Sequence, residues 1–272
     1  MSSIVTSEGI LHYEVDGRGK PILFLHGWLS SWGLWRDTML TLSEERRYRI
    51  YALDFWGFGD SAKRSVKSFN VVSYVSMVNQ FMDKMGIAYA PIIGHSMGGT
   101  VALSLALEFP SRVQKVIVVG SPVAGQSLSP LLKLASFRLI ANLVWRAPSA
   151  LLLGLKLFSP LLAKDGQQVY EILKRDFSQT TLEAFLVSIG SLWRTDLRPR
   201  LGQVGVEVLG IYGKGDNVVN PNQAEVLARG VSKAETKMMF ESRHFPMLDE
   251  PETFRQSVLS FLERDKGAPQ RQ

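Results

Sequence analysis

The sequence predicts an α/β protein with a mostly parallel β-sheet, helices on both faces of the sheet and a helical lid inserted between two strands. Short apolar, β-branched runs alternate with helical patterns along most of the chain, which is typical of such a sheet. Residues 122–200 interrupt the alternation, because they are rich in leucine and carry no strand pattern. The 272 residues are enough to bury a full core in addition to this insertion.

Seven runs have the composition of strands, and helical patterns lie between them. The predicted strands are 10–15, 21–26, 49–54, 89–94, 113–120, 206–213 and 236–241. The predicted helices lie near 32–43, 70–85, 97–109, 221–230 and 250–264. The third helix is expected to end at Phe109, because Pro110 cannot continue it. These elements assign residues 1–121 and 201–272 to one core domain.

Residues 122–200 are predicted to form the helical lid, since an insertion of this length is too long for a loop. Ser129 and Pro130 are a good N-cap and first-turn pair for its first helix. The lid holds ten of the 31 Lys and Arg residues but only five of the 25 Asp and Glu residues. We favour an ordinary cap, whose leucines pack inward, and regard a lid that faces a membrane as the alternative. An apolar roof over the site is then expected from Phe137, Trp145 and Phe158.

The composition excludes several classes of function. The absence of cysteine rules out disulfides, thiolate metal sites and a cysteine nucleophile. The net charge of +6 is concentrated in the lid and no nucleic-acid module is recognisable, so nucleic acid is not an expected partner. The N-terminus lacks a secretory pattern and no run is long enough for a membrane span, so we expect a cytoplasmic protein. The oligomeric state is left open.

Ser96 stands among glycines in the stretch PIIGHSMGGTVAL (91–103), where a predicted strand meets a predicted helix. Glycines in the first turn of a helix cost about 1 kcal/mol each relative to alanine, so either this cost is incidental or the backbone needs them. A sharp turn would expose the serine hydroxyl, and Gly94 and Gly98 would remove side chains that clash. The N–H of Met97 would then be free at the helix N-terminus to stabilise an oxyanion. The pattern therefore predicts that Ser96 is a nucleophile.

A base and a carboxylate are expected on other loops at the same sheet edge. His244 lies between the last predicted strand and helix, where its ring could reach Ser96. The other histidines lie in or beside strands or adjoin the serine: His12, His26 and His95. Asp216 follows an apolar strand in a Gly-rich turn and could orient His244, although a turn-forming role is the alternative.

Trp28 follows His26 and Gly27 at the end of a predicted strand. Its backbone N–H lies where a second oxyanion donor is expected, and its indole could wall an acyl pocket. Core packing is the alternative for the indole. An arrangement of this kind requires no metal and no organic cofactor.

Several motifs, in this order, resemble those of the α/β-hydrolase superfamily over almost the whole chain. They are LHGW (25–28), DFWGFGDS (54–61), GHSMGG (94–99), GKGDNVV (213–219) and RHFPMLDEPETF (243–254). HGW together with SMGG is most similar to the esterase and cofactor-free perhydrolase-like branch. The resemblance implies the following roles: Ser96 as nucleophile, His244 as base, Asp216 as orienting acid, and the N–H groups of Trp28 and Met97 as oxyanion hole.

Other positions refine this resemblance. Asp54 and Gly57 match a structural turn of the family, and Arg243 stands where the family often has glycine. A serine at position 96 argues against dehalogenases and epoxide hydrolases, which use an aspartate nucleophile. Carbon–carbon bond hydrolases usually have Gly-Pro-Gly after the first His-Gly and tryptophan after the last histidine, whereas this chain has WLS (28–30) and Phe245.

The sequence therefore predicts a serine hydrolase that cleaves carboxylic esters of short-to-medium apolar acyl chains through an acyl-enzyme, with a small-molecule ester as its partner. The alternatives are another acyl or carbon–carbon hydrolase of the same fold, such as a lactonase or thioesterase, and a membrane-surface lipase. A non-catalytic ligand-binding protein is the alternative from another class. The presence of all three triad residues argues against it.

Overall fold

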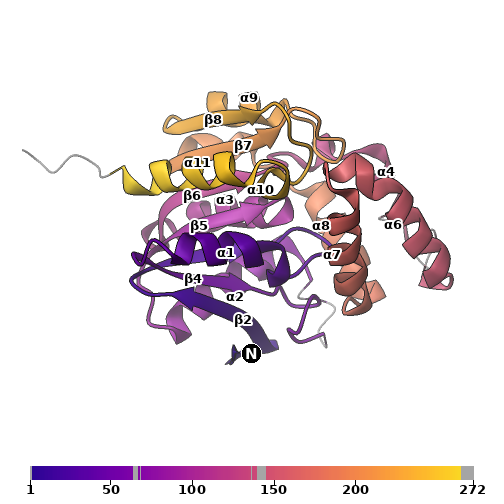
Figure 1. Cartoon of the computed structure of the whole chain (residues 1–272). Coiled ribbons are helices and arrows are strands. Elements are labelled where there is room, and N and C mark those ends of the chain that lie inside the picture. The colour runs from indigo at the N-terminus through magenta and orange to yellow at the C-terminus, as the bar shows by residue number, and fades with distance from the viewer. Residues whose placement is uncertain (1, 64–66, 68, 136, 140–144, 265–272) are drawn as a thin grey trace, which may run out of the picture.

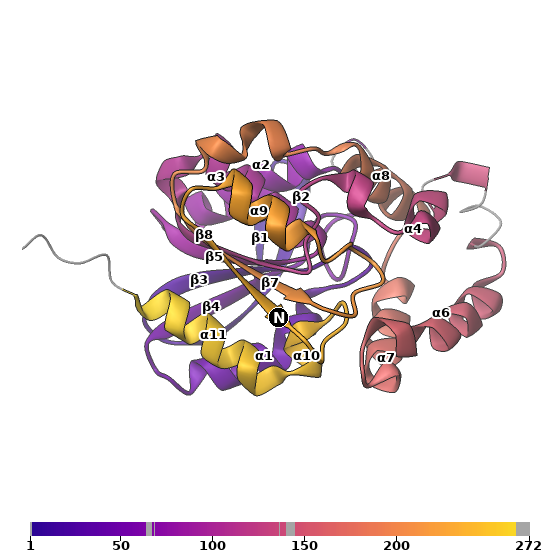
Figure 2. The same cartoon turned by 90° about the horizontal axis from the view of Figure 1, so that it is seen from above.

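The computed structural model describes residues 2–63, 67, 69–135, 137–139 and 145–264, which contain one eight-stranded sheet with helices on both faces (Figures 1 and 2). Its strands are β1 (Ser2–Thr6), β2 (Gly9–Gly17), β3 (Lys20–Leu25), β4 (Tyr48–Leu53), β5 (Ala90–His95), β6 (Val113–Val119), β7 (Glu207–Gly213) and β8 (Ala234–Met239). They are arranged in the order β1-β2-β4-β3-β5-β6-β7-β8. The pairs β1–β2 and β2–β4 are antiparallel and the remaining pairs are parallel. The predicted fold class is confirmed.

All seven predicted strands are present, with ends that differ by at most two residues. The additional strand, β1, pairs only with β2 at the edge of the sheet. Its side chains alternate between exposed and half-buried until the last, buried residue. A short, polar edge strand of this kind leaves little hydrophobic signal in the sequence.

Different helices cover the two faces of the sheet (Figure 2). One face carries α2 (Val71–Lys84), α3 (Met97–Glu108) and α9 (Gln223–Gly230), and the other carries α1 (Arg36–Ser43), α10 (Pro246–Asp249) and α11 (Pro251–Glu263). Successive residues of β3 pack on opposite faces of the sheet. Leu23 packs on the side of α2 and α3, and Phe24 packs on the side of α1 and α11. Burial on both faces is why the parallel strands are continuous apolar runs.

Four α-helices lie between β6 and β7 in the described residues, and we call them the cap: α4 (Pro130–Ala135), α6 (Pro148–Leu162), α7 (Gly166–Ser178) and α8 (Leu182–Arg194). The cap stands at one end of the sheet, and α6 lies on its outer side (Figures 1 and 2). Its first helix begins at Pro130, whereas residues 136 and 140–144 of the predicted helical stretch lie outside the described residues. Among the described helices, none combines the length and the apolar composition needed to cross a membrane.

The expectation that the lid leucines pack inward holds for only part of α4 and α6: Leu132, Leu151, Leu152, Leu155 and Leu162 pack against buried clusters, and others do not. Seven apolar side chains of this region are between 47% and 69% exposed: Leu131, Leu134, Phe137, Leu153, Leu157, Phe158 and Leu161. Leucines surround α6 on most sides, whereas only part of its circumference contacts α7, so the others face outward. Of the three residues expected in the roof, Trp145 does pack inward, against Phe177 and Phe185.

Candidate active site

Ser96 occupies the turn between β5 and α3 in a strained backbone conformation. Its φ of 50° and ψ of −117° lie in a region that residues with a side chain rarely adopt. A Cβ on Gly94 would lie 2.2 Å from the carbonyl group of Gly98, and a Cβ on Gly98 would lie 2.3 Å from the carbonyl oxygen of Leu25. The chain can make this turn because both glycines lack side chains.

Asp216 and His244 form a buried pair on neighbouring loops, after β7 and after β8. Oδ2 of Asp216 lies 2.8 Å from Nδ1 of His244. Oδ1 of Asp216 accepts the backbone N–H groups of Val218 and Val219, at 2.7 and 2.9 Å. A carboxylate can only accept, so Nδ1 of His244 carries the proton and Nε2 is left as its basic nitrogen.

The end of β6 brings the serine and this pair together. The N–H of Ser96 donates to the carbonyl of Val119 at 2.8 Å. The next residue, Gly120, has a φ of 53°, and a Cβ on it would lie 3.3 Å from Nδ1 of His244 and 3.4 Å from Oδ2 of Asp216. Ser96, Asp216 and His244 therefore gather at the carboxyl edge of the parallel strands. The contribution of Gly120 has no sequence signal beyond its place at a strand end.

The two expected oxyanion donors belong to residues that adjoin the serine turn. Met97 is the first residue of α3, and Gly27, which precedes Trp28, packs so closely that an added Cβ would lie 3.2 Å from Cβ of Ser96. Leu29 has a φ of 56°, so this loop is strained as the serine turn is. The indole of Trp28 lies 4.4 Å from the ring of Phe185 in α8, and its Nε1 donates to the carbonyl of Phe185 at 3.0 Å. The indole therefore joins this loop to the cap.

Two other histidines near the site are buried and make structural contacts. Nε2 of His95 lies 2.9 Å from the carbonyl oxygen of His244, and burial holds the pKa of His95 well below its usual value. The neutral ring therefore donates this hydrogen bond and supports the loop of His244. His26 accepts the N–H of Phe55 through Nε2 at 3.0 Å and donates through Nδ1 to Gly27 at 2.7 Å. Burial lowers the pKa of His26 as well.

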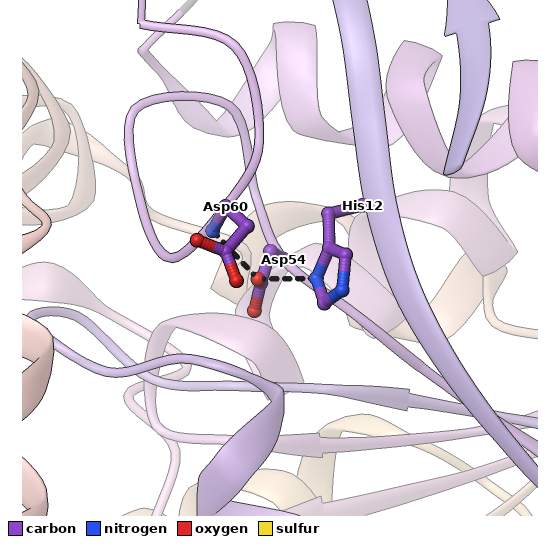
Figure 3. Close-up of side chains that lie close together, drawn as sticks. All are labelled: His12, Asp54 and Asp60. Atoms are coloured by element: carbon purple, nitrogen blue, oxygen red, sulfur yellow. Dashed lines mark hydrogen bonds and ion pairs between the residues drawn. The ribbon is translucent and has the colours of Figure 1, made fainter. Parts of the chain in front are cut away.

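A second histidine–aspartate pair, His12 with Asp54, lies where β2 meets the end of β4, beside Asp60 (Figure 3). Nδ1 of His12 lies 2.8 Å from Oδ2 of Asp54. Burial lowers the pKa of His12, but its hydrogen bond to Asp54 and the nearby negative charges outweigh burial and raise that pKa.

The ligand atoms of His12, Asp54 and Asp60 lie within 4.8 Å of one another, as in a metal site. However, Oδ2 of Asp54 also accepts the N–H of Asp60 at 3.0 Å, and Oδ1 accepts the N–H of Trp32 at 2.7 Å. Both oxygens already hold backbone in place, so the cluster fits a structural turn better than a cation.

The side chain of Arg243 binds the C-terminal end of cap helix α6. Its Nη1 donates to the carbonyl of Pro160 and, at 2.9 Å, to the carbonyl of Ala163. The last carbonyls of a helix have no partners within the helix, and a cation there also interacts favourably with the helix dipole. The sequence marks Arg243 only as a departure from the usual glycine, so this contact with the cap was not foreseen.

Backbone and amide groups of the loops after β7 and β8 complete this contact. The N–H of His244 donates to the carbonyl of Leu162 at 3.0 Å. Nδ2 of Asn217, the residue after Asp216, donates to the carbonyl of Leu161 at 3.3 Å. The end of α6 is thus attached directly to both loops that carry the histidine–aspartate pair.

Two relatives are similar to the chain over nearly its full length. A 2-hydroxy-6-oxo-6-phenylhexa-2,4-dienoate hydrolase from Comamonas testosteroni is 26% identical over 265 residues, covering 94% of this chain and 92% of the relative. A pimeloyl-[acyl-carrier protein] methyl ester esterase from Vibrio cholerae is 26% identical over 267 residues, covering 93% of this chain and 98% of the relative.

Solved structures share the fold. An esterase from Exiguobacterium antarcticum matches with a TM-score of 0.83 at 24% identity, covering 96% of this chain and 99% of the other. An enol-lactonase from Burkholderia xenovorans matches with a TM-score of 0.81 at 22% identity, with the same coverage of 96% and 99%. A sequence model of the family described as "alpha/beta hydrolase fold" matches residues 20–157, more than half of the chain. The chain therefore belongs to the α/β-hydrolase family.

Proposed function

We propose that this chain is a serine hydrolase that cleaves carboxylic esters through an acyl-enzyme. The observation that carries the proposal is the strained turn of Ser96 beside the Asp216–His244 pair. Backbone strain at a buried turn costs stability, and such strain is concentrated at functional sites because it presents a reactive group. A purely structural turn would have no use for a serine at this position.

In the proposed reaction, Nε2 of His244 accepts the hydroxyl proton of Ser96 while the serine oxygen attacks the ester carbonyl. The resulting oxyanion accepts the N–H groups of Met97 and Trp28. His244 is stabilised in its charged form by Asp216 and gives the proton to the departing alcohol. Water that has lost a proton to His244 then cleaves the acyl-enzyme, which releases the acid and restores Ser96.

The acyl chain of the substrate is proposed to lie under the cap. Leu29, Phe177 and Phe185 form an apolar cluster, with Trp28 and Trp145 packed against it. Leu29 lies two residues from Gly27, which touches Ser96, so this apolar surface adjoins the nucleophile. Each methylene buried there would contribute up to about 0.8 kcal/mol. We propose short-to-medium acyl chains for this surface.

The relatives supply a second candidate reaction. The Vibrio cholerae relative is named for ester hydrolysis, which supports the proposal, whereas the Comamonas testosteroni relative is named for hydrolysis of a 2-hydroxy-6-oxo-dienoate. The WLS stretch at 28–30 and Phe245 depart from the usual pattern of carbon–carbon bond hydrolases and favour the ester.

Ser96→Ala tests the nucleophile, with Ser104→Ala as its control. Ser104 lies in the same helix, and its hydroxyl donates to the carbonyl of Thr100 at 2.8 Å. We expect Ser96→Ala to lower kcat on p-nitrophenyl esters by about 10⁴-fold and Ser104→Ala to leave it unchanged. A fluorophosphonate should attach once, at Ser96, as located by mass spectrometry. Folded Ser96→Ala with the wild-type rate, or an adduct on another residue, would refute the proposal.

A substrate series tests the reaction class. We expect kcat/KM to rise over the first carbons of the acyl chain and to fall when the chain outgrows the site. Turnover of a 2-hydroxy-6-oxo-dienoate with greater kcat/KM than any ester in the series would assign the chain to the second candidate.

A further inference from the structure

The outer side of α6 carries an exposed apolar stripe. Leu153, Leu157, Phe158 and Leu161 are 59%, 69%, 47% and 48% exposed. Their spacing of four, five and eight residues from Leu153 places them on one face of the helix. We call these four residues the α6 stripe. Four large apolar side chains on one helix face form the kind of exposed patch that marks an interaction surface.

The charged residues of the chain segment that carries the stripe are all cationic. No acidic residue occurs between Glu108 and Asp165, and the charged residues from 129 to 164 are Lys133, Arg138, Arg146, Lys156 and Lys164. Arg146 precedes α6 and Lys156 lies within it, and both side chains are exposed. Lys164 follows the helix, where it pairs with the exposed carboxylate of Glu241 at 3.5 Å. A partner of the stripe would therefore need an apolar surface bordered by negative charge.

We propose that the α6 stripe binds the surface of an anionic lipid membrane. A helix with apolar side chains on one face and cations beside them lies in the interface between headgroups and acyl chains. Anionic headgroups would attract Arg146 and Lys156, while the leucines and Phe158 enter the acyl region. A second copy of the chain is a poorer occupant, because a symmetric contact would bring cationic surfaces of the same kind together.

The attachment of α6 to the catalytic loops gives this surface a fixed place in the molecule. Arg243 and the N–H of His244 hold the C-terminal end of the helix. A membrane bound to the stripe therefore lies beside the cap, one helix away from the loop of His244. Binding itself needs no catalysis, so its test is independent of the proposed ester hydrolysis.

Vesicle co-flotation of the full chain tests the proposal directly. The wild-type protein is expected to float with vesicles that contain phosphatidylglycerol, to bind pure phosphatidylcholine much less, and to release as salt is raised. The double variant Leu153→Gln/Leu157→Gln should lower the partition coefficient by about tenfold for each leucine. Lys156→Glu changes two units of charge and should lower it by about thirtyfold.

Matched controls lie on α2, away from α6 (Figure 2). Val72→Gln replaces a side chain that is 79% exposed, and Lys84→Glu makes the same change of charge as Lys156→Glu. Both should bind like the wild type, and unchanged melting temperatures should show that all variants are folded. Absence of vesicle binding, equal binding to both lipids, or wild-type binding by the α6 variants would overturn the proposal. A dimer in light scattering that the double leucine variant abolishes, without vesicle binding, would assign the stripe to a second copy.

Discussion

Replacing Arg243 with alanine should loosen the cap from the loops that carry Asp216 and His244. The guanidinium makes two hydrogen bonds to the end of α6, at Pro160 and Ala163. Because the side chain is partly exposed, we assign each bond about 1 kcal/mol, the ordinary net contribution, so the pair contributes about 2 kcal/mol. That free energy corresponds to about a thirtyfold change in the equilibrium between docked and undocked α6. The global stability of the core should change much less.

Hydrogen exchange followed by mass spectrometry measures this equilibrium segment by segment. Amides of α6 should exchange about thirtyfold faster in Arg243→Ala, while those of β5 and β6 keep their wild-type rates. Arg229→Ala is the control, since the exposed Arg229 pairs with Glu225 within α9. Wild-type exchange in α6, or the same acceleration throughout the core, would show that Arg243 does not hold the cap.

The remaining predictions concern the serine turn, a glycine of α6 and His12. Gly98→Ala should destabilise the protein by about 1–3 kcal/mol in urea unfolding, because its Cβ would meet the carbonyl of Leu25 at 2.3 Å. Gly154→Ala in α6, with nothing within 4 Å, should instead stabilise α6 by up to about 1 kcal/mol; equal effects of the two substitutions would contradict the steric argument. Since the hydrogen bond to Asp54 raises the pKa of His12, its stabilising effect is complete below the unfolded value of about 6.5 and declines as pH rises through the higher folded value. The stability lost in His12→Gln should therefore be larger at low than at high pH, and a loss independent of pH would refute the charged pair.

Local patterns in the sequence determined the strand and helix order of the core and singled out the serine turn. Strands buried on both faces are continuous apolar runs, and Gly94 and Gly98 flank Ser96 because no other residue fits the turn. These features are local, since hydrophobic period, turn chemistry and steric limits act within a few residues. The edge strand β1 lacked this signal because most of its side chains remain partly or fully exposed.

Only the tertiary structure decided which leucines of the cap are buried and how the cap contacts the site. A helix with leucines on most sides has no single apolar face, so the side that α7 covers is set by packing and not by period. The bond from Arg243 to Pro160 joins residues 83 positions apart, and the close approach of Gly120 to the Asp216–His244 pair joins three separate strand ends. Contacts between distant segments leave no periodic trace in the sequence, because they depend on how the elements are placed in space and not on the residues beside them.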